Sequence, residues 1–141
     1  QILFKSISTA LINKDIILKA LMWSEKIIKS LDYIGVICVE FFIDKNDKLY
    51  VNEIAPRVHN SGHLTIESYN ISQFESHVRA VCNLEKIEPK IQNEAEMLNI
   101  LGSDIFKYRN KVNKNNQFFH DYFKNEAKKG RKMGHLTKIK N

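Results

Sequence analysis

Residues 34–54 read IGVICVEFFIDKNDKLYVNEI, and this stretch decides the fold of the first half of the chain. Its two flanks, residues 34–43 and 49–54, are rich in β-branched and aromatic side chains, which favour strands. The polar residues 44–48 between them are typical of a turn. The pattern therefore predicts two antiparallel strands joined by a hairpin.

The register of this hairpin would bring two glutamates together. A four-residue loop pairs Asp44 with Leu49. The same register places Glu40 directly opposite Glu53, with their Cβ atoms roughly 5 Å apart on one face. Two carboxylates this close must share a proton, attract cations or bind a metal, and Mg²⁺ takes one or two carboxylates together with water and phosphate oxygens. The alternative is a register shifted by one residue, which would turn one glutamate to solvent.

Polar residues are concentrated directly after the second strand. Residues 51–63, VNEIAPRVHNSGH, add one arginine and two histidines to the glutamate pair. The planar guanidinium of Arg57 suits an oxyanion, and its alternative role is that of an exposed arginine paired with a nearby acid. Asn52 precedes Glu53 and would face outward if the strand alternated regularly. So dense a group of polar side chains is more typical of a site than of packing.

The composition is that of a modest globular protein. The chain has 141 residues, 43% of them hydrophobic, and no run near the roughly 18 apolar residues of a membrane span. Its 22 basic residues, 18 lysines and only 4 arginines, outnumber 16 acidic residues and give a net charge of +6. They do not form the basic and aromatic clusters of a nucleic-acid-binding surface. The first residues, QILFKSIST, do not follow the plan of a signal peptide, which predicts a cytoplasmic protein. We therefore expect no membrane or nucleic-acid partner.

Elements on both sides of the hairpin predict an α+β fold. A strand is expected over residues 2–8, and Asn13 or Asp15 can cap a helix that ends near Leu31. Ser72 and Glu75 form a capping box, which predicts a second helix that ends near residue 84.

The composition changes from residue 85, where Pro89 and its polar neighbours mark a boundary. Three short strands are expected beyond it: residues 97–101, 118–123 and 133–139. We therefore predict two domains, residues 1–84 and residues 85–141.

Two motifs resemble one known family. NEIAPRVHNSGH at residues 52–63, followed by SQFESHVRAVCNL at residues 72–84, resembles the signature of the 5-(carboxyamino)imidazole ribonucleotide synthases, ATP-grasp enzymes of de novo purine biosynthesis. KNEAKKGRKMGHLT at residues 124–137 resembles the C-terminal block of the same family. The two motifs stand in the family's order, and the resemblance covers nearly the whole chain.

The resemblance implies both a fold and an incomplete enzyme. Residues 1–84 would be the second half of an ATP-grasp domain, an antiparallel sheet with helices, and residues 85–141 a small β-rich C-terminal domain. Family members are well over twice as long, and their N-terminal α/β domain and lid subdomain have no counterpart here. We therefore expect these 141 residues alone to be inactive. The complete enzyme, with its missing N-terminal half, would be a homodimer.

The activity implied by the resemblance is an ATP-dependent ligase reaction that forms a C–N bond. Bicarbonate would be phosphorylated by ATP, and the carboxyphosphate would carboxylate the amine of 5-aminoimidazole ribonucleotide. Glu40 and Glu53 would bind Mg²⁺ or Mn²⁺, while Asn52 and Glu53 would meet the phosphates of ATP. Three catalytic residues would hold the bicarbonate-derived group: Arg57, His59 and Asn60.

The C-terminal block implies the binding site of the ribonucleotide. Lys124, Arg131 and Lys132 would contact its phosphate, whereas without the resemblance they read as a solvated basic loop. Phe123 stands where the family usually has a glycine between a tyrosine and this lysine, and Leu64 stands where an aromatic residue often follows Gly-His. Neither departure removes a charged group.

Two other kinds of protein stay open. One is a non-catalytic remnant that still folds, and the other is a basic binding module unrelated to catalysis. A neighbouring reading frame that ends with an ATP-grasp lid would favour the carboxylase over both.

Overall fold

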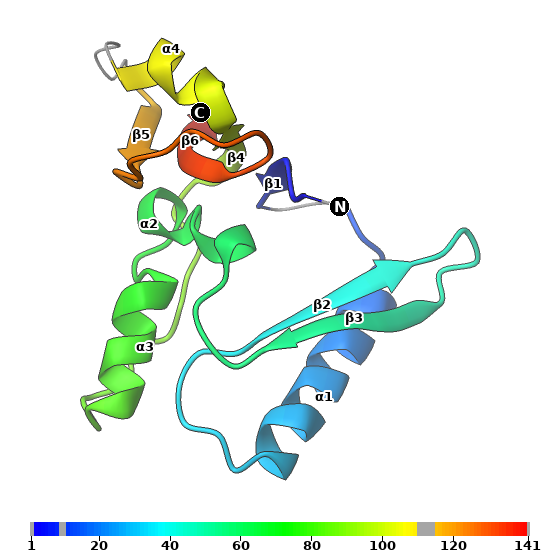
Figure 1. The fold of residues 1–141 in the computed structure, drawn as a ribbon. Coiled ribbons are helices and arrows are strands. Elements are labelled where there is room, and N and C mark those ends of the chain that lie inside the picture. The colour runs from blue at the N-terminus through cyan, green and yellow to red at the C-terminus, as the bar shows by residue number, and fades with distance from the viewer. Residues whose placement is uncertain (1, 9–10, 110–114, 141) are drawn as a thin grey trace. The chain divides into compact units, whose positions relative to one another are not determined.

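The computed structural model describes residues 2–8, 11–109 and 115–140, and the chain forms two compact units (Figure 1). Unit 1 consists of Gln1–Thr9, His63–Asn70 and Pro89–Asn141, and unit 2 consists of Ala10–Gly62 and Ile71–Glu88. These units are defined by spatial contacts alone. The domain boundary predicted between residues 84 and 85 therefore stays a prediction.

Unit 2 is built on the predicted hairpin. Strands β2 (Cys38–Ile43) and β3 (Leu49–Ala55) pair antiparallel. Helix α1 (Lys14–Ser30) lies along them (Figure 1). The Trp23 ring of α1 lies 6.2 Å from the Phe41 ring of β2, measured between centroids. The hairpin thus packs one apolar face toward the first helix, where Ile16 of α1 and Leu49 of β3 are buried and Phe41 is half-buried.

The helices begin at the residues that the capping signals predict. The Asn13 side chain caps α1, and the Glu75 N–H donates to Ser72 Oγ at 3.2 Å at the start of α3 (Gln73–Val81). The second helix ends three residues before residue 84, and Asn83 has already turned into the left-handed region with φ 51°. Both predicted helices are confirmed, with this shorter end for α3.

Unit 1 is an antiparallel sheet of four strands. Its order is β1–β4–β6–β5, which span Lys5–Ile7, Glu94–Leu101, Lys132–Lys140 and Gln117–Asp121 respectively. Three short helical segments accompany the sheet: α2 (Thr65–Ser68), η2 (Gly102–Ile105) and α4 (Phe106–Arg109). A buried apolar cluster forms its core: Ile100, Ile105, Met133 and Leu136. The α+β class and the three strands predicted beyond residue 85 are confirmed, and the first strand of the chain joins the same sheet.

The hairpin loop is one residue longer than predicted. Ile43, not Asp44, pairs with Leu49, so the predicted Asp44 pairing is wrong. The Asp44 carboxylate accepts hydrogen bonds from the N–H groups of Asn46 (2.8 Å) and Lys48 (3.0 Å). These bonds make Asp44 part of the turn and withdraw it from the strand ladder, as aspartate commonly does in tight turns.

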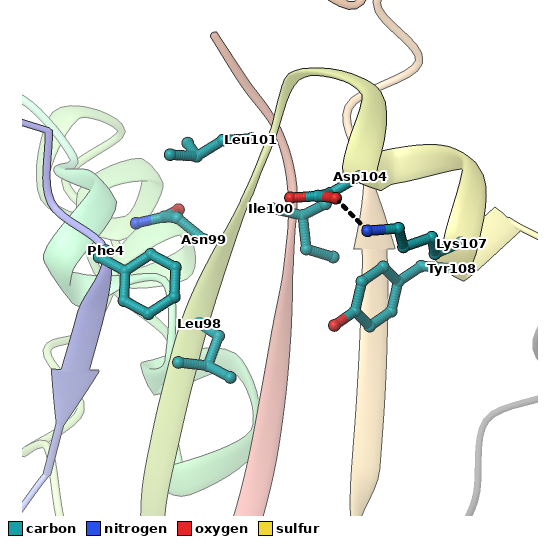
Figure 2. A pocket seen from close by; sticks show the side chains of 8 residues that line it. All are labelled: Phe4, Leu98, Asn99, Ile100, Leu101, Asp104, Lys107 and Tyr108. Carbon is teal, nitrogen blue, oxygen red and sulfur yellow. Dashed lines mark hydrogen bonds and ion pairs between the residues drawn. The ribbon is translucent and has the colours of Figure 1, made fainter. Parts of the chain in front are cut away.

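A cavity of about 220 Å³ lies within unit 1 (Figure 2). Figure 2 shows its lining: Phe4, Leu98, Asn99, Ile100, Leu101, Asp104, Lys107 and Tyr108. Its one drawn ion pair joins Lys107 Nζ to Asp104 Oδ1 at 2.6 Å. None of the predicted site residues lines this cavity. No described helix, moreover, has the length and apolar character needed to cross a membrane.

Candidate functional site

A β-bulge brings three predicted site residues onto one face of the hairpin. The register shifts between Glu40 and Phe41, which leaves Asn52 as an extra residue on β3. A bulge re-aims the side chain of the extra residue, and here Asn52 Nδ2 donates to Glu40 Oε2 at 3.1 Å. Glu40 pairs directly with Glu53, as the sequence predicts. The bulge therefore overrides the outward orientation that regular alternation would give Asn52.

The loop after β3 adds a histidine and an arginine to this face. His59 Nδ1 lies 3.5 Å from Glu40 Oε1, and His59 Nε2 lies 4.0 Å from Glu53 Oε1. Ser61 Oγ lies 2.8 Å from His59 Nδ1, which orients the ring. The Arg57 guanidinium lies 3.8 Å from Glu53 Oε1. The structure thus brings four charged or ionisable predicted residues into one cluster.

Gln73 holds the loop in place, and sequence reasoning did not identify it. This first residue of α3 is 9% exposed. Its Oε1 accepts a hydrogen bond from the His59 N–H at 3.0 Å, and its Nε2 donates to the His59 carbonyl oxygen at 2.8 Å. Asn60, which the resemblance implies as a catalytic residue, directly follows His59 and begins the 3₁₀ turn η1 (Asn60–Gly62). A Cβ atom on Gly62 would lie 2.7 Å from Gln73 Oε1, so the glycine in HNSGH allows this close approach.

The glutamate pair suits a hard divalent cation. The side chains of Glu40 and Glu53 are 29% and 49% exposed, so water and further ligands can reach them. Mg²⁺ typically takes one or two protein carboxylates and completes its octahedron with water and phosphate oxygens. The nearby Arg57 guanidinium can neutralise an anion held beside such an ion, and the His59 ring can hydrogen-bond to it. This face can therefore bind a cation and an anion together.

The basic residues of the C-terminal block lie in unit 1. Lys124 Nζ donates to the Lys132 carbonyl oxygen at 2.7 Å and lies 5.4 Å from the centroid of the Tyr122 ring. The Arg131 guanidinium donates to the Glu126 carbonyl oxygen at 3.4 Å. Arg131 is exposed, whereas Lys124 and Lys132 are half-buried. The structure thus brings Lys124 against Lys132, directly beside Arg131.

Phe123 occupies a backbone position that favours glycine. Its φ is 51°, and the residue is 83% exposed. Its N–H donates to Asp121 Oδ1 at 2.8 Å, which holds the turn before Lys124. Left-handed backbone is easily adopted by glycine and disfavoured for a large side chain. The glycine usual in the resembled family would adopt this left-handed conformation without strain, whereas Phe123 adopts it at a cost in free energy. The other departure, Leu64, is buried in unit 1.

Comparison with known proteins identifies the class of domain. Residues 1–74 match the ATP-grasp domain family, and residues 95–141 match the phosphoribosylaminoimidazole carboxylase C-terminal domain. The chain therefore belongs to the ATP-grasp family.

The relatives then place the chain within that family. The N5-carboxyaminoimidazole ribonucleotide synthase of Staphylococcus aureus strain MRSA252 is 45% identical over 148 residues, which cover 100% of this chain and 38% of the relative. A crystal structure of the Staphylococcus aureus synthetase with ADP matches with a TM-score of 0.90, 45% identity and the same coverage of both chains. The Aspergillus clavatus synthase with ADP and 5-aminoimidazole ribonucleotide matches with a TM-score of 0.85 and 35% identity over 97% of this chain and 39% of that one.

The chain corresponds to the C-terminal portion of these synthases, as its two motifs indicate. It spans about 38% of the length of the curated relatives that it matches over its full length.

Proposed function

We propose that this chain supplies the face that binds metal and nucleotide phosphates in an enzyme that carboxylates 5-aminoimidazole ribonucleotide with ATP and bicarbonate. The observation that carries the proposal is the β-bulge, because it gathers Asn52 and Glu53 around Glu40 on one face. The solved Staphylococcus aureus relative was crystallised with ADP, which supports nucleotide binding by this fold.

Glu40 and Glu53 are the proposed metal ligands. They would hold Mg²⁺ or Mn²⁺, which supplies charge neutralisation for the phosphates of ATP. Asn52 donates its amide hydrogen to Glu40, so the amide and this carboxylate hold each other in position. Asn52 and Glu53 are the proposed contacts to ATP.

The proposed chemistry proceeds in two displacements. An oxygen of bicarbonate attacks the γ-phosphorus of ATP, and ADP leaves. The amine of the ribonucleotide then attacks the carboxyl carbon of carboxyphosphate, and the C–O bond to phosphate breaks as the C–N bond forms. The nitrogen gives up one proton, which the departing inorganic phosphate takes. Preorganised donors that face the developing charge provide most of the catalysis in such transfers. Three residues of the loop after β3 have this proposed role: Arg57, His59 and Asn60.

The ribonucleotide is proposed to bind through the C-terminal block. Lys124, Arg131 and Lys132 present cationic groups on a turn whose backbone accepts hydrogen bonds from two of them. Guanidinium and ammonium groups are the usual ligands of a phosphate monoester. The Aspergillus clavatus relative was crystallised with 5-aminoimidazole ribonucleotide, which supports the same substrate class here.

The further partners are proposals of the same kind. The enzyme would work in the cytoplasm, as a homodimer that includes the N-terminal half of the ATP-grasp fold. Its ligands would be small molecules, with no nucleic acid and no membrane.

A complementation experiment tests the proposed function. The chain is co-expressed with the N-terminal part of the Staphylococcus aureus synthase, and ADP release that depends on both bicarbonate and the ribonucleotide is measured. Glu53→Gln should lower kcat by at least about 100-fold, because it removes a ligand charge without changing volume. The matched control is Glu85→Gln, an exposed glutamate outside the cluster, which should leave kcat unchanged.

Each outcome decides between the functions considered. If the chain and the co-expressed N-terminal part are active together and lose activity with Glu53→Gln, the carboxylase is supported. If the two polypeptides assemble without activity, the chain is a non-catalytic remnant. A chain that does not assemble but binds polyanions indicates a basic binding module. Normal activity of Glu53→Gln would refute the metal assignment.

A further inference from the structure

A second cluster of ionisable groups lies in unit 1, on residues of α2 and of two sheet strands, elements that Figure 1 labels. Glu67 comes from α2, His120 from β5 and His135 from β6. One ligand atom from each of these residues lies within 4.8 Å of the others. None of the three belongs to the proposed carboxylation site.

His135 and the Glu67 side chain are more than nine-tenths buried, His120 is partly exposed, and two polar atoms of the cluster have no hydrogen-bond partner among the described residues. His135 is 2% exposed, and the Glu67 side chain is 7% exposed. Glu67 Oε1 accepts a hydrogen bond from His120 Nε2 at 2.5 Å. Glu67 Oε2 and His135 Nε2 are the two atoms left without a hydrogen bond. Buried polar atoms are normally satisfied, so this pair points to a ligand between them.

The orientation of the His135 ring is fixed by a further hydrogen bond. Its Nδ1 lies 2.9 Å from the Tyr122 hydroxyl oxygen. If Nδ1 carries the proton and donates to this hydroxyl, the lone pair of Nε2 is available inside the cluster. The His120 ring stacks on the His135 ring, with centroids 4.5 Å apart and planes inclined by 17°. Histidines that bind a metal through one ring nitrogen characteristically hydrogen-bond through the other, as His135 Nδ1 does with the Tyr122 hydroxyl.

We propose that Glu67, His120 and His135 bind one divalent transition-metal ion, with Zn²⁺ as the preferred ion. Two imidazole nitrogens and one carboxylate form a donor set typical of zinc, and they leave a fourth position for water. Hard ions such as Mg²⁺ prefer oxygen ligands only, so this site differs in kind from the Glu40–Glu53 pair. The ion would replace the proton between His120 and Glu67 and join α2 to strands β5 and β6.

Metal uptake by the 141-residue chain tests this site directly. The chain is stripped with a chelator, dialysed against ZnCl₂ and analysed for zinc by atomic emission. We expect one zinc ion per chain. X-ray absorption should show two imidazole nitrogens and a carboxylate oxygen at about 2.0–2.2 Å from zinc.

Variants separate this site from other zinc ligands. His120→Ala should weaken zinc binding by at least about 100-fold, and Tyr122→Phe, which removes only the outer hydrogen bond, by about 10-fold to 100-fold. Glu126→Gln, an exposed glutamate of unit 1 outside the cluster, is the control and should leave zinc affinity unchanged. Glu53→Gln shows whether zinc binds at the Glu40–Glu53 pair instead. The His120 side chain is 34% exposed, so circular dichroism should show an intact fold in His120→Ala.

Substoichiometric zinc in the unmodified chain would overturn the proposal. So would zinc affinity that His120→Ala leaves unchanged, or that Glu53→Gln abolishes. Any of these results would leave the cluster as a hydrogen-bonded network without a metal.

Discussion

Gln73 should stabilise the loop that holds His59, and its contribution follows from two hydrogen bonds. Gln73→Ala removes the bonds to the His59 N–H and carbonyl oxygen. Each such bond contributes about 0.5–1.5 kcal/mol net, so the variant should lose about 1–3 kcal/mol of unfolding free energy. The exposed Gln92→Ala is the control and should change stability by less than about 0.5 kcal/mol.

Gly62→Ala should act through the same two hydrogen bonds between Gln73 and the His59 backbone. The new Cβ would lie 2.7 Å from Gln73 Oε1 and 3.0 Å from Gln73 Cδ, so the amide must move and give up its bonds to His59. The single variant should therefore also lose about 1–3 kcal/mol. In a chain that already has Gln73→Ala, the amide is absent and Gly62→Ala should cost almost nothing.

A double-mutant cycle measures this coupling. Urea unfolding of the four chains, followed by circular dichroism, should give an interaction energy of about 1–3 kcal/mol between Gln73 and Gly62. Losses that add within about 0.5 kcal/mol would refute the claim that Gly62→Ala acts by displacing the Gln73 amide, because they would show that the two positions act independently.

Three further predictions concern the substrate site and two turns. Arg131→Ala should raise the apparent KM for the ribonucleotide and leave that for ATP nearly unchanged in the complemented enzyme; equal damage to both would indicate misfolding instead. Phe123→Gly should raise the unfolding free energy by about 0.5–1 kcal/mol, since release of left-handed strain of about 1–2 kcal/mol outweighs the added freedom of the unfolded chain; a loss in urea unfolding would contradict this. The backbone N–H groups of Lys48 and Asn46 lower the pKa of Asp44 below its ordinary value of 3.8. The stabilisation of the folded chain by this carboxylate is therefore present above pH 3.8 and is lost as the pH falls through the lower pKa of the folded state. Asp44→Asn should flatten the pH dependence of the urea midpoint in this acid range, and an unchanged slope would speak against the role of the carboxylate.

Local patterns were enough to predict the main elements. The β-branched runs around residues 44–48 predict the hairpin, and the Ser72 capping box predicts α3. The pairing of Glu40 with Glu53 is also confirmed, although the loop that implied it is wrong. The longer loop shifts the register by one residue, and the bulge at Asn52 shifts it back. The correct pair therefore came from two compensating features that the residue pattern does not show.

Other features depend on contacts between distant residues. β1 pairs with β4, which lies about ninety residues further along the chain, and no periodicity reports such a partner. Gln73 looks like any polar residue in a first helical turn, and only the structure shows that its amide meets the His59 backbone. The roles of Arg57 and the C-terminal block rest on resemblance, since a basic residue alone does not identify its ligand.

The central proposal is that this chain is the C-terminal portion of a carboxylating ATP-grasp enzyme and works only together with the N-terminal portion. The most direct measurement is ADP release, dependent on bicarbonate and 5-aminoimidazole ribonucleotide, by the purified chain alone and by the chain paired with a synthase N-terminal half. We predict no such activity for the chain alone and clear activity for the pair. Turnover by the chain alone at the rate of the pair, or a stable pair without any activity, would contradict the claim.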